Sequence, residues 1–270
     1  MDLLTAIVLG TLQGLTEFLP VSSSGHLVLG GYLLGLREPH LLFDIVVHVG
    51  TLVATVVFYR RALLAMARDT LVWMRGKGAR GSVSAGQARF MGLIGLGSIP
   101  TAIIGIVFRE PLEALFGAPR LAGAMLLVTG MMLLLSRRWN GGDVSLEHMR
   151  PWQALIIGTM QGFAIIPGIS RSGATITAAL VLGLNRELAA RFSFLLALPA
   201  ILGALLLKLG DGYDVLAAAD AWVLAAGGLT SSVIGVLALA MLIPVVRGGR
   251  FFLFGFYLLP LGAMTLWLLR

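Results

Sequence analysis

The amino-acid sequence predicts an all-α polytopic membrane protein built as an inverted repeat, each half a re-entrant helical hairpin plus three transmembrane helices. The first supporting observation is composition: of 270 residues, 58% are hydrophobic and only 12% are charged, whereas a soluble domain carries about 25% charged residues. The second is a set of long apolar stretches, and the third is an internal repeat. The length fits a single membrane domain covering residues 1–270.

The long apolar stretches are sufficient to cross a bilayer, which takes about 20 apolar residues in a helix. Between them lie short polar or charged connections. We expect six transmembrane helices, at roughly 41–59, 90–108, 119–136, 188–208, 221–245 and 251–269.

Two further apolar regions, about 3–36 and 152–184, are interrupted in the middle by Pro, Gly, Ser and charged residues. Each predicts two short helices joined by a polar tip, which enters the membrane and returns on the same side. Irregular backbone at that depth is tolerated only where protein or water surrounds it. We therefore expect both tips to lie inside the protein.

The two interrupted regions repeat one another at a shift of 148 residues. Ten of 27 aligned positions between 10–36 and 158–184 are identical, without a gap. The repeat predicts two halves, about 1–136 and 152–270, whose broken helices meet at a shared site. The alternative is that all the helical pieces simply pack, with Pro and Gly as kinks.

Charge placement predicts the topology and excludes one class of partner. The sequence pI is near 10.7, but the basic residues concentrate in one connection, as expected for the cytoplasmic side of a membrane protein rather than for nucleic-acid binding. That connection holds Arg60, Arg61, Arg68, Arg75, Lys77, Arg80 and Arg89, and the opposite side should hold Asp211, Asp214 and Asp220. The first hairpin then enters from outside and the second from the cytoplasm. With no cysteine, disulfides and thiolate chemistry are excluded.

The first tip, in the stretch QGLTEFLPVSSSGH, begins with an amide and a carboxylate four residues apart. Gln13 and Glu17 share one face of a helix, and an ionisable residue at membrane depth indicates function. Their oxygens suit a divalent cation, Mg²⁺ or Ca²⁺, and Glu17 also suits a base. The alternative is a carboxylate paired with a neighbouring helix.

After Pro20 the chain restarts as a helix whose first turn carries hydroxyl groups. Ser22, Ser23 and Ser24, followed by Gly25, occupy the cap and first turn, and a helix N-terminus binds phosphate. His26 lies on the same turn, within reach of a ligand held there.

The second tip, PGISRSGAT, places an arginine where the first tip has Ser23. Arg171 suits bidentate phosphate binding, and hydroxyl groups and a glycine surround it: Ser170, Ser172, Gly173 and Thr175. A carboxylate, hydroxyls and imidazole opposed to a fixed positive charge indicate phosphoryl transfer. Asp44 and His48 either orient the first tip or pair with each other.

These two motifs resemble the signatures of the undecaprenyl-diphosphate phosphatase (bacitracin-resistance) family, and the resemblance covers the whole chain. It implies a divalent-cation-dependent enzyme of the bacterial inner membrane with its site open to the extracytoplasmic side. The family's acidic pair is here Gln13 and Glu17, and its motif serine, histidine and arginine are Ser23, His26 and Arg171. From the resemblance we expect an amide side chain at position 48, where this chain has His48. The resemblance therefore implies no role for His48.

Residues and resemblance together predict hydrolysis of undecaprenyl diphosphate to undecaprenyl phosphate and inorganic phosphate. Ser23 is the expected nucleophile, activated by His26 or Glu17, with a directly activated water as the alternative. The expected partners are a polyprenyl diphosphate and membrane lipid, and a homodimer is left open. The competing function is a polyprenyl-phosphate transporter or flippase, since the same repeat plan serves alternating access.

Overall fold

The computed structural model describes residues 1–33, 41–76, 83–139, 141–210 and 221–269. Apart from one isolated bridge between Val144 and Leu184, the regular structure of these segments is helical, which confirms the all-α prediction. Several residues used above lie outside the described segments: residues 34–36 at the end of the first repeated region, Lys77, Arg80 and the acidic residues Asp211, Asp214 and Asp220.

Within the described segments, six helices are long and apolar enough to cross a membrane, as predicted. The last one begins with a short 3₁₀ turn, η2 (Phe251–Leu253). The six are α3 (Leu41–Met74), α4 (Val83–Val107), α6 (Pro119–Ser136), α9 (Arg186–Gly210), α10 (Ala221–Arg247) and α11 (Phe254–Leu268).

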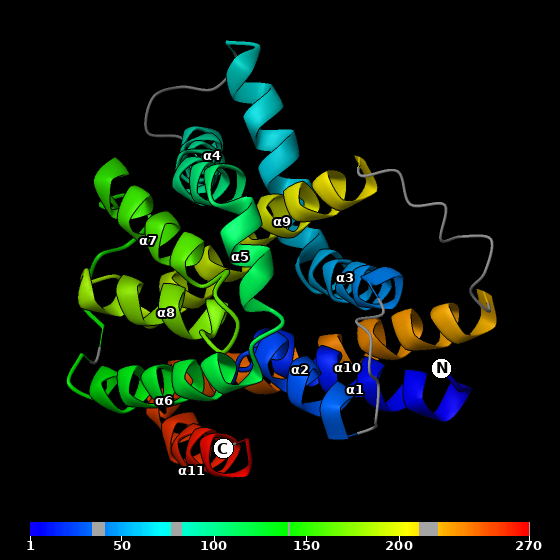
Figure 1. The fold of residues 1–270 in the computed structure, drawn as a ribbon. Helices are drawn as coiled ribbons and strands as arrows, with labels where there is room; N and C mark the ends of the chain where they lie inside the picture. Colours follow the sequence, from blue (N-terminus) through cyan, green and yellow to red (C-terminus); the bar gives the residue numbers. More distant parts are fainter. Residues whose placement is uncertain (34–40, 77–82, 140, 211–220, 270) are drawn as a thin grey trace.

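The structure departs from the predicted helices in the length of α3 and in an additional short helix. The helix expected over 41–59 continues to Met74, and its far end stands away from the other helices (Figure 1). No Gly or Pro interrupts the chain between Gly50 and Gly76, and the basic residues of this extension are good helix formers. The turn follows at Gly76, whose φ of 69° suits glycine. A short helix, α5 (Arg109–Leu115), was not predicted.

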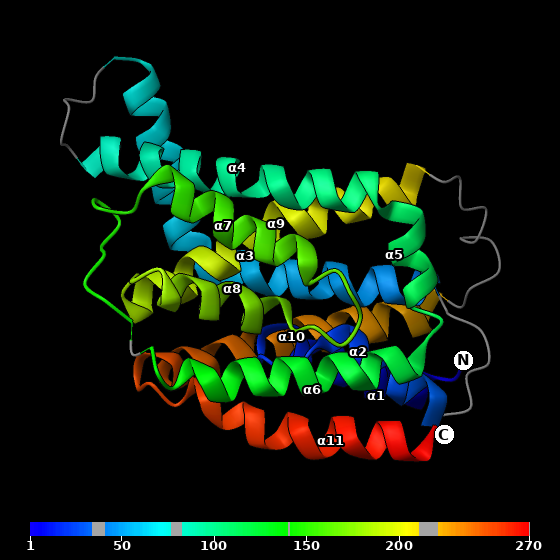
Figure 2. The ribbon, with the colours of Figure 1, turned by 60° about the vertical axis from the view of Figure 1, so that its left-hand side comes forward.

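Both interrupted regions form the expected helix–turn–helix hairpins. The first contains α1 (Leu3–Phe18) and α2 (Ser23–Leu33), and the second contains α7 (Pro151–Phe163) and α8 (Arg171–Val181). The first hairpin starts at the end of the molecule where both termini lie, and the second starts at the opposite end (Figure 2). Their re-entry into a membrane and the inverted relation of the two halves stay predictions.

Glycines let each hairpin pack on a helix of the other half of the chain. Helix α1 lies against α10, and α7 lies against α4. A Cβ on Gly158 would overlap the carbonyl oxygen of Gly97, and Gly10, the repeat counterpart of Gly158, meets Gly227 in the same way. Such close approach of small residues is a common means of packing membrane helices. It holds the tips of both hairpins inside the molecule.

Candidate active site

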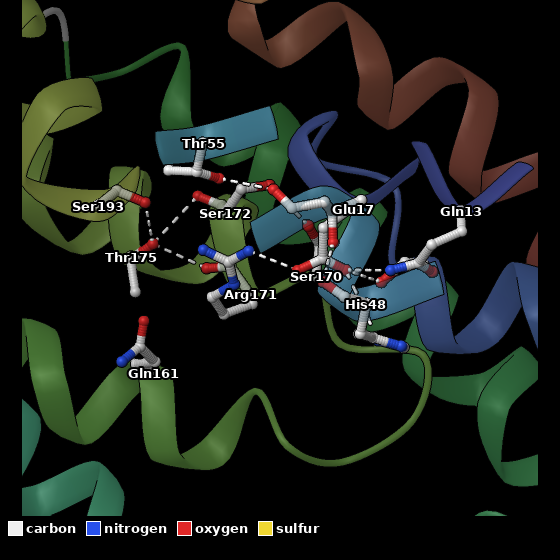
Figure 3. Close-up of polar contacts among 12 residues, drawn as sticks. Gln13, Glu17, His48, Thr55, Gln161, Ser170, Arg171, Ser172, Thr175 and Ser193 are labelled. Atoms are coloured by element: carbon white, nitrogen blue, oxygen red, sulfur yellow. Dashed lines mark hydrogen bonds and ion pairs between the residues drawn. The ribbon is translucent and has the colours of Figure 1, made fainter. Parts of the chain in front are cut away.

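The two hairpin tips meet through a buried ion pair. Glu17 lies at the end of α1 and Arg171 is the first residue of α8. The Nη2 atom of Arg171 donates to Oε1 of Glu17 at 2.6 Å, and the side chains are only 14% and 6% exposed (Figure 3). Removing one partner of such a pair leaves an uncompensated buried charge. The pair therefore couples two segments 154 residues apart in sequence.

The other carboxylate oxygen of Glu17 accepts two more hydrogen bonds. Ser23 Oγ donates to Oε2 at 2.6 Å, and Gln13 Nε2 donates to the same atom at 3.0 Å. Gln13 is fully buried, one helical turn before Glu17 (Figure 3). The structure thus gathers three of the predicted site residues around the carboxylate of a fourth, Glu17.

Matching serines build the two tips with the same hydrogen bonds. Ser22 Oγ accepts from the Gly25 N–H at 3.3 Å, and Ser170 Oγ accepts from the Gly173 N–H at 3.1 Å. Each capping hydroxyl also lies 3.3 Å from the hydroxyl two residues later, Ser24 in the first tip and Ser172 in the second. The tips differ in backbone, because Ser22 has a φ of 67°.

Several polar groups at the meeting point lack a hydrogen-bond partner within the described chain. Within the described chain, Nη1 of Arg171 and Oε1 of Gln13 are buried without a hydrogen-bond partner. The N–H groups of Ser23 and Ser24 stand in the first turn of α2, where helix geometry provides no backbone acceptor. A cationic donor and helix N–H groups are complementary to phosphate oxygens.

The remaining residues predicted to bind substrate have structural contacts. A Cβ on Gly25 would lie 3.2 Å from Leu126, and one on Gly173 would lie 3.0 Å from the Ser170 side chain. Ser172 Oγ donates to the Leu19 carbonyl at 3.3 Å, which ties the second tip to the first.

Thr175 lies beneath Arg171 rather than beside Glu17. Its hydroxyl donates to the Arg171 carbonyl at 2.8 Å and lies 2.5 Å from Ser193 Oγ (Figure 3). Both residues are fully buried. Ser193 has no motif around it, so sequence reasoning did not find this support for Arg171.

His26 contacts neither Glu17 nor Ser23 among the described interactions. Its Nδ1 lies 2.8 Å from the Ser22 carbonyl oxygen, and its Nε2 lies 2.8 Å from the Tyr257 hydroxyl of α11. The sequence did not predict the role of Tyr257, because its contact with His26 joins residues 231 apart. The residues that flank Tyr257 form no motif.

His48 approaches the site from α3. Its Nδ1 lies 2.7 Å from the backbone carbonyl of Asp44, and its Nε2 lies 3.9 Å from Oε2 of Glu17. The i, i+4 spacing of Asp44 and His48 was the signal for this position. His48 thus lies near both Asp44 and Glu17, and its role stays a prediction.

The residues around Glu17 fit a divalent cation only if the substrate completes its coordination. The described chain places no group of three or more His, Cys, Asp or Glu to hold a metal. The unpartnered Oε1 of Gln13 and the Glu17 carboxylate are oxygen ligands of the type that Mg²⁺ and Ca²⁺ prefer. Mg²⁺ is usually held by one or two carboxylates together with substrate phosphates.

Comparisons with known proteins agree on one family. The family model described as bacitracin resistance protein BacA matches residues 6–264. A protein of Desulfosudis oleivorans, described as undecaprenyl-diphosphatase, is 48% identical over 99% of both chains. Proteins with the same description from Methanosphaera stadtmanae and Geobacter sulfurreducens are each 41% identical over 98% of both chains.

Proposed function

The chain belongs to the bacitracin resistance protein BacA family, and we propose that it hydrolyses undecaprenyl diphosphate to undecaprenyl phosphate and inorganic phosphate. This is a phosphatase reaction that recycles the lipid carrier of peptidoglycan synthesis, and it accounts for bacitracin resistance. The observation that carries it is the buried constellation in which Glu17 contacts both Arg171 and the Ser23 hydroxyl.

The diphosphate binds where the two tips meet. Nη1 of Arg171 has no partner in the described structure, so it can donate to a phosphate oxygen without losing a hydrogen bond. The N-terminal N–H groups of α2 add donors and a positive dipole end. Together they stabilise the negative charge that spreads over the terminal phosphate in the transition state.

Ser23 is the nucleophile and Glu17 is its base. The Ser23 hydroxyl already donates to Oε2 of Glu17, so its proton passes there as Oγ attacks the terminal phosphorus. The bond to the bridging oxygen breaks, and undecaprenyl phosphate leaves. As Glu17 becomes neutral, its attraction for Arg171 falls, and the guanidinium is released to the phosphate.

Water completes the cycle. It attacks the phosphorus of phosphorylated Ser23, Oγ leaves and regains the proton from Glu17, and inorganic phosphate departs with both protons of the water as dihydrogen phosphate. The alternative is direct attack by a water activated at Glu17, which forms no phosphoserine. His26 is the second candidate base, although its nitrogens contact Ser22 and Tyr257.

Gln13 and Glu17 are the residues that would hold a divalent cation. A bound Mg²⁺ or Ca²⁺ would neutralise charge on the diphosphate oxygens. Gln13 cannot act as a base, so its part is to donate to Glu17 through Nε2 and to offer Oε1 as a ligand.

The multi-pass fold supports the remaining parts of the proposal. Six apolar helices suit a lipid substrate whose tail stays in the bilayer. We place the protein in the bacterial inner membrane, with lipid around it and the site open to the extracytoplasmic side, because its basic connections favour a cytoplasmic position. A homodimer is a further proposal. The names of the relatives favour hydrolysis over the transporter alternative.

Phosphate release from undecaprenyl diphosphate by the detergent-purified protein tests the proposal. We expect release that a chelator abolishes and that Mg²⁺ or Ca²⁺ restores, with a loss of at least about a hundredfold in Glu17→Gln and Arg171→Ala. Glu113→Gln is the matched control, because it removes the carboxylate of an exposed pair with Arg109. Folded protein that moves a lipid phosphate across vesicles without releasing phosphate would overturn hydrolysis.

A further inference from the structure

His26 is buried, and both of its ring nitrogens have a partner. The side chain lies at the start of α2, 7% exposed. Nδ1 faces the Ser22 carbonyl oxygen at 2.8 Å, and a carbonyl only accepts, so Nδ1 carries the hydrogen. In the neutral ring Nε2 must then be an acceptor, and the Tyr257 hydroxyl at 2.8 Å is its donor.

The Tyr257 hydroxyl can serve the ring in both of its protonation states. A phenol is both donor and acceptor, so it donates to Nε2 of a neutral imidazole and accepts from Nε2–H of a protonated one. The rings of His26 and Tyr257 are also stacked, with centroids 5.7 Å apart and planes at 21°. Hydrogen bond and stacking together fix the plane and the tautomer of the imidazole.

The position of Tyr257 is itself fixed by close helix packing. Gly255 and Gly262 of α11 lie on either side of it in sequence, and Cβ atoms there would lie 2.7 Å and 2.8 Å from the carbonyl oxygens of Gly130 and Gly123 of α6. Helix α6 also contacts α2. Packing of α11 on α6 thus fixes the Tyr257 hydroxyl beside His26 in the first tip.

We propose that Tyr257 is a positioning residue that holds His26 in the Nδ1–H tautomer, with the basic Nε2 hydrogen-bonded to the Tyr257 hydroxyl. This deepens the proposed function, in which His26 is the second candidate base beside Glu17, and it rests on that role of His26 for the catalytic consequence. No contact of Tyr257 with Glu17, Ser23 or Arg171 is found among the described residues, so it acts through His26.

Nitrogen-15 spectra of histidine-labelled protein test the tautomer without any need for activity. His26→Ala identifies the His26 signals among the four histidines. We expect wild-type Nδ1–H with a hydrogen-bonded, unprotonated Nε2, and a shifted Nε2 signal in Tyr257→Phe, which removes the hydroxyl and keeps the ring. A wild-type Nε2–H tautomer, or an Nε2 signal unchanged in Tyr257→Phe, would overturn the proposal.

Steady-state phosphate release tests the consequence through a double-mutant cycle. Tyr257→Phe should lower kcat about tenfold with KM changed less than about twofold, since it disturbs proton transfer and not binding. In a His26→Ala background the same change should cost less than about twofold, because coupled residues are not additive. Tyr59→Phe is the control and should leave kcat unchanged, because it keeps the ring that packs on Phe194 and removes a hydroxyl of α3 that no described hydrogen bond joins to either tip.

The two arms separate the failure of this proposal from the failure of the proposed function. A wild-type protein without phosphatase activity would end the hydrolytic proposal, and the spectra would still decide the tautomer. Equal losses from Tyr257→Phe in the presence and absence of His26 would show that Tyr257 does not act through the imidazole.

Discussion

The Glu17 carboxylate has partners of three kinds: a guanidinium, a hydroxyl and an amide. The Arg171 guanidinium offsets the cost of placing a carboxylate at 8% exposure. The hydroxyl of Ser23 and the amide of Gln13 share the second oxygen. This arrangement directs the Glu17 carboxylate toward the one hydroxyl that the mechanism needs to activate.

Replacing Ser23 tests the nucleophile directly. Ser23→Ala should lower kcat by at least about a thousandfold, because the attacking oxygen is lost, and a phosphorylated serine should be trapped in the wild type by rapid acid quenching. Ser98→Ala on α4 is the control, since that hydroxyl only donates to the Ile94 carbonyl. Near-normal turnover in Ser23→Ala would remove Ser23 as nucleophile and leave a directly activated water.

A second carboxylate at position 13 tests the cation site. In Gln13→Glu the unpartnered amide oxygen becomes a charged ligand one turn from Glu17, so we expect the Mg²⁺ or Ca²⁺ concentration for half-maximal activity to fall about tenfold. Without cation the variant should melt at a lower temperature, because like charges four residues apart repel. An unchanged cation requirement would show that Gln13 is not a ligand.

The sequence predicted the contacts between residues that lie within one helical turn of each other. The i, i+4 spacing of Gln13 and Glu17 and the capping positions of Ser22 and Ser170 follow from helix geometry alone. The link from Tyr257 to His26 depends on tertiary packing across most of the chain. No local pattern could supply it.

Among the helices, a close glycine contact in each hairpin fixes the hairpin against a helix of the other half of the chain. Each tip sits at the end of a short helix whose glycine is in direct contact with the backbone of the opposite half. Close backbone contact of this kind sets the position of each short helix on its neighbour. The repeat in sequence predicted matching hairpins, but which helix each hairpin would contact depended on three-dimensional packing. The length of α3 was missed because its basic residues were taken for a connection.

The glycine contact of α7 can be tested by adding one methyl group. Gly158→Ala places a Cβ against the Gly97 carbonyl oxygen, and overpacking of this kind costs about 1–3 kcal/mol. We expect a lower melting temperature in detergent and a loss of activity, as the second tip shifts. Gly95→Ala on α4 is the control, because no atom lies within 4 Å of its Cβ. Equal stability of the two variants would show that the contact is not a constraint.

For the whole molecule, the open question is whether the two halves are inverted in the membrane. Helix α1 begins at the end of the molecule that holds both termini and α5, and α7 begins at the end where α3 extends (Figure 2). Because the basic residues gather on the α3 extension, the charge rule places that end in the cytoplasm. The site between the tips would then be reached by hairpins that enter from opposite sides.

Labelling of single introduced cysteines can show whether the two halves are inverted. The natural chain has no cysteine, so only the introduced one can react. Asp2, Arg75, Glu113 and Arg150 are exposed, so each cysteine variant should react once it is accessible. In intact cells a membrane-impermeant maleimide should label Asp2→Cys and Glu113→Cys, whereas Arg75→Cys and Arg150→Cys should react only after permeabilisation. Labelling of Asp2→Cys and Arg150→Cys from the same side would refute the inversion. A pattern reversed at all four positions would keep the inversion and refute the orientation drawn from charge.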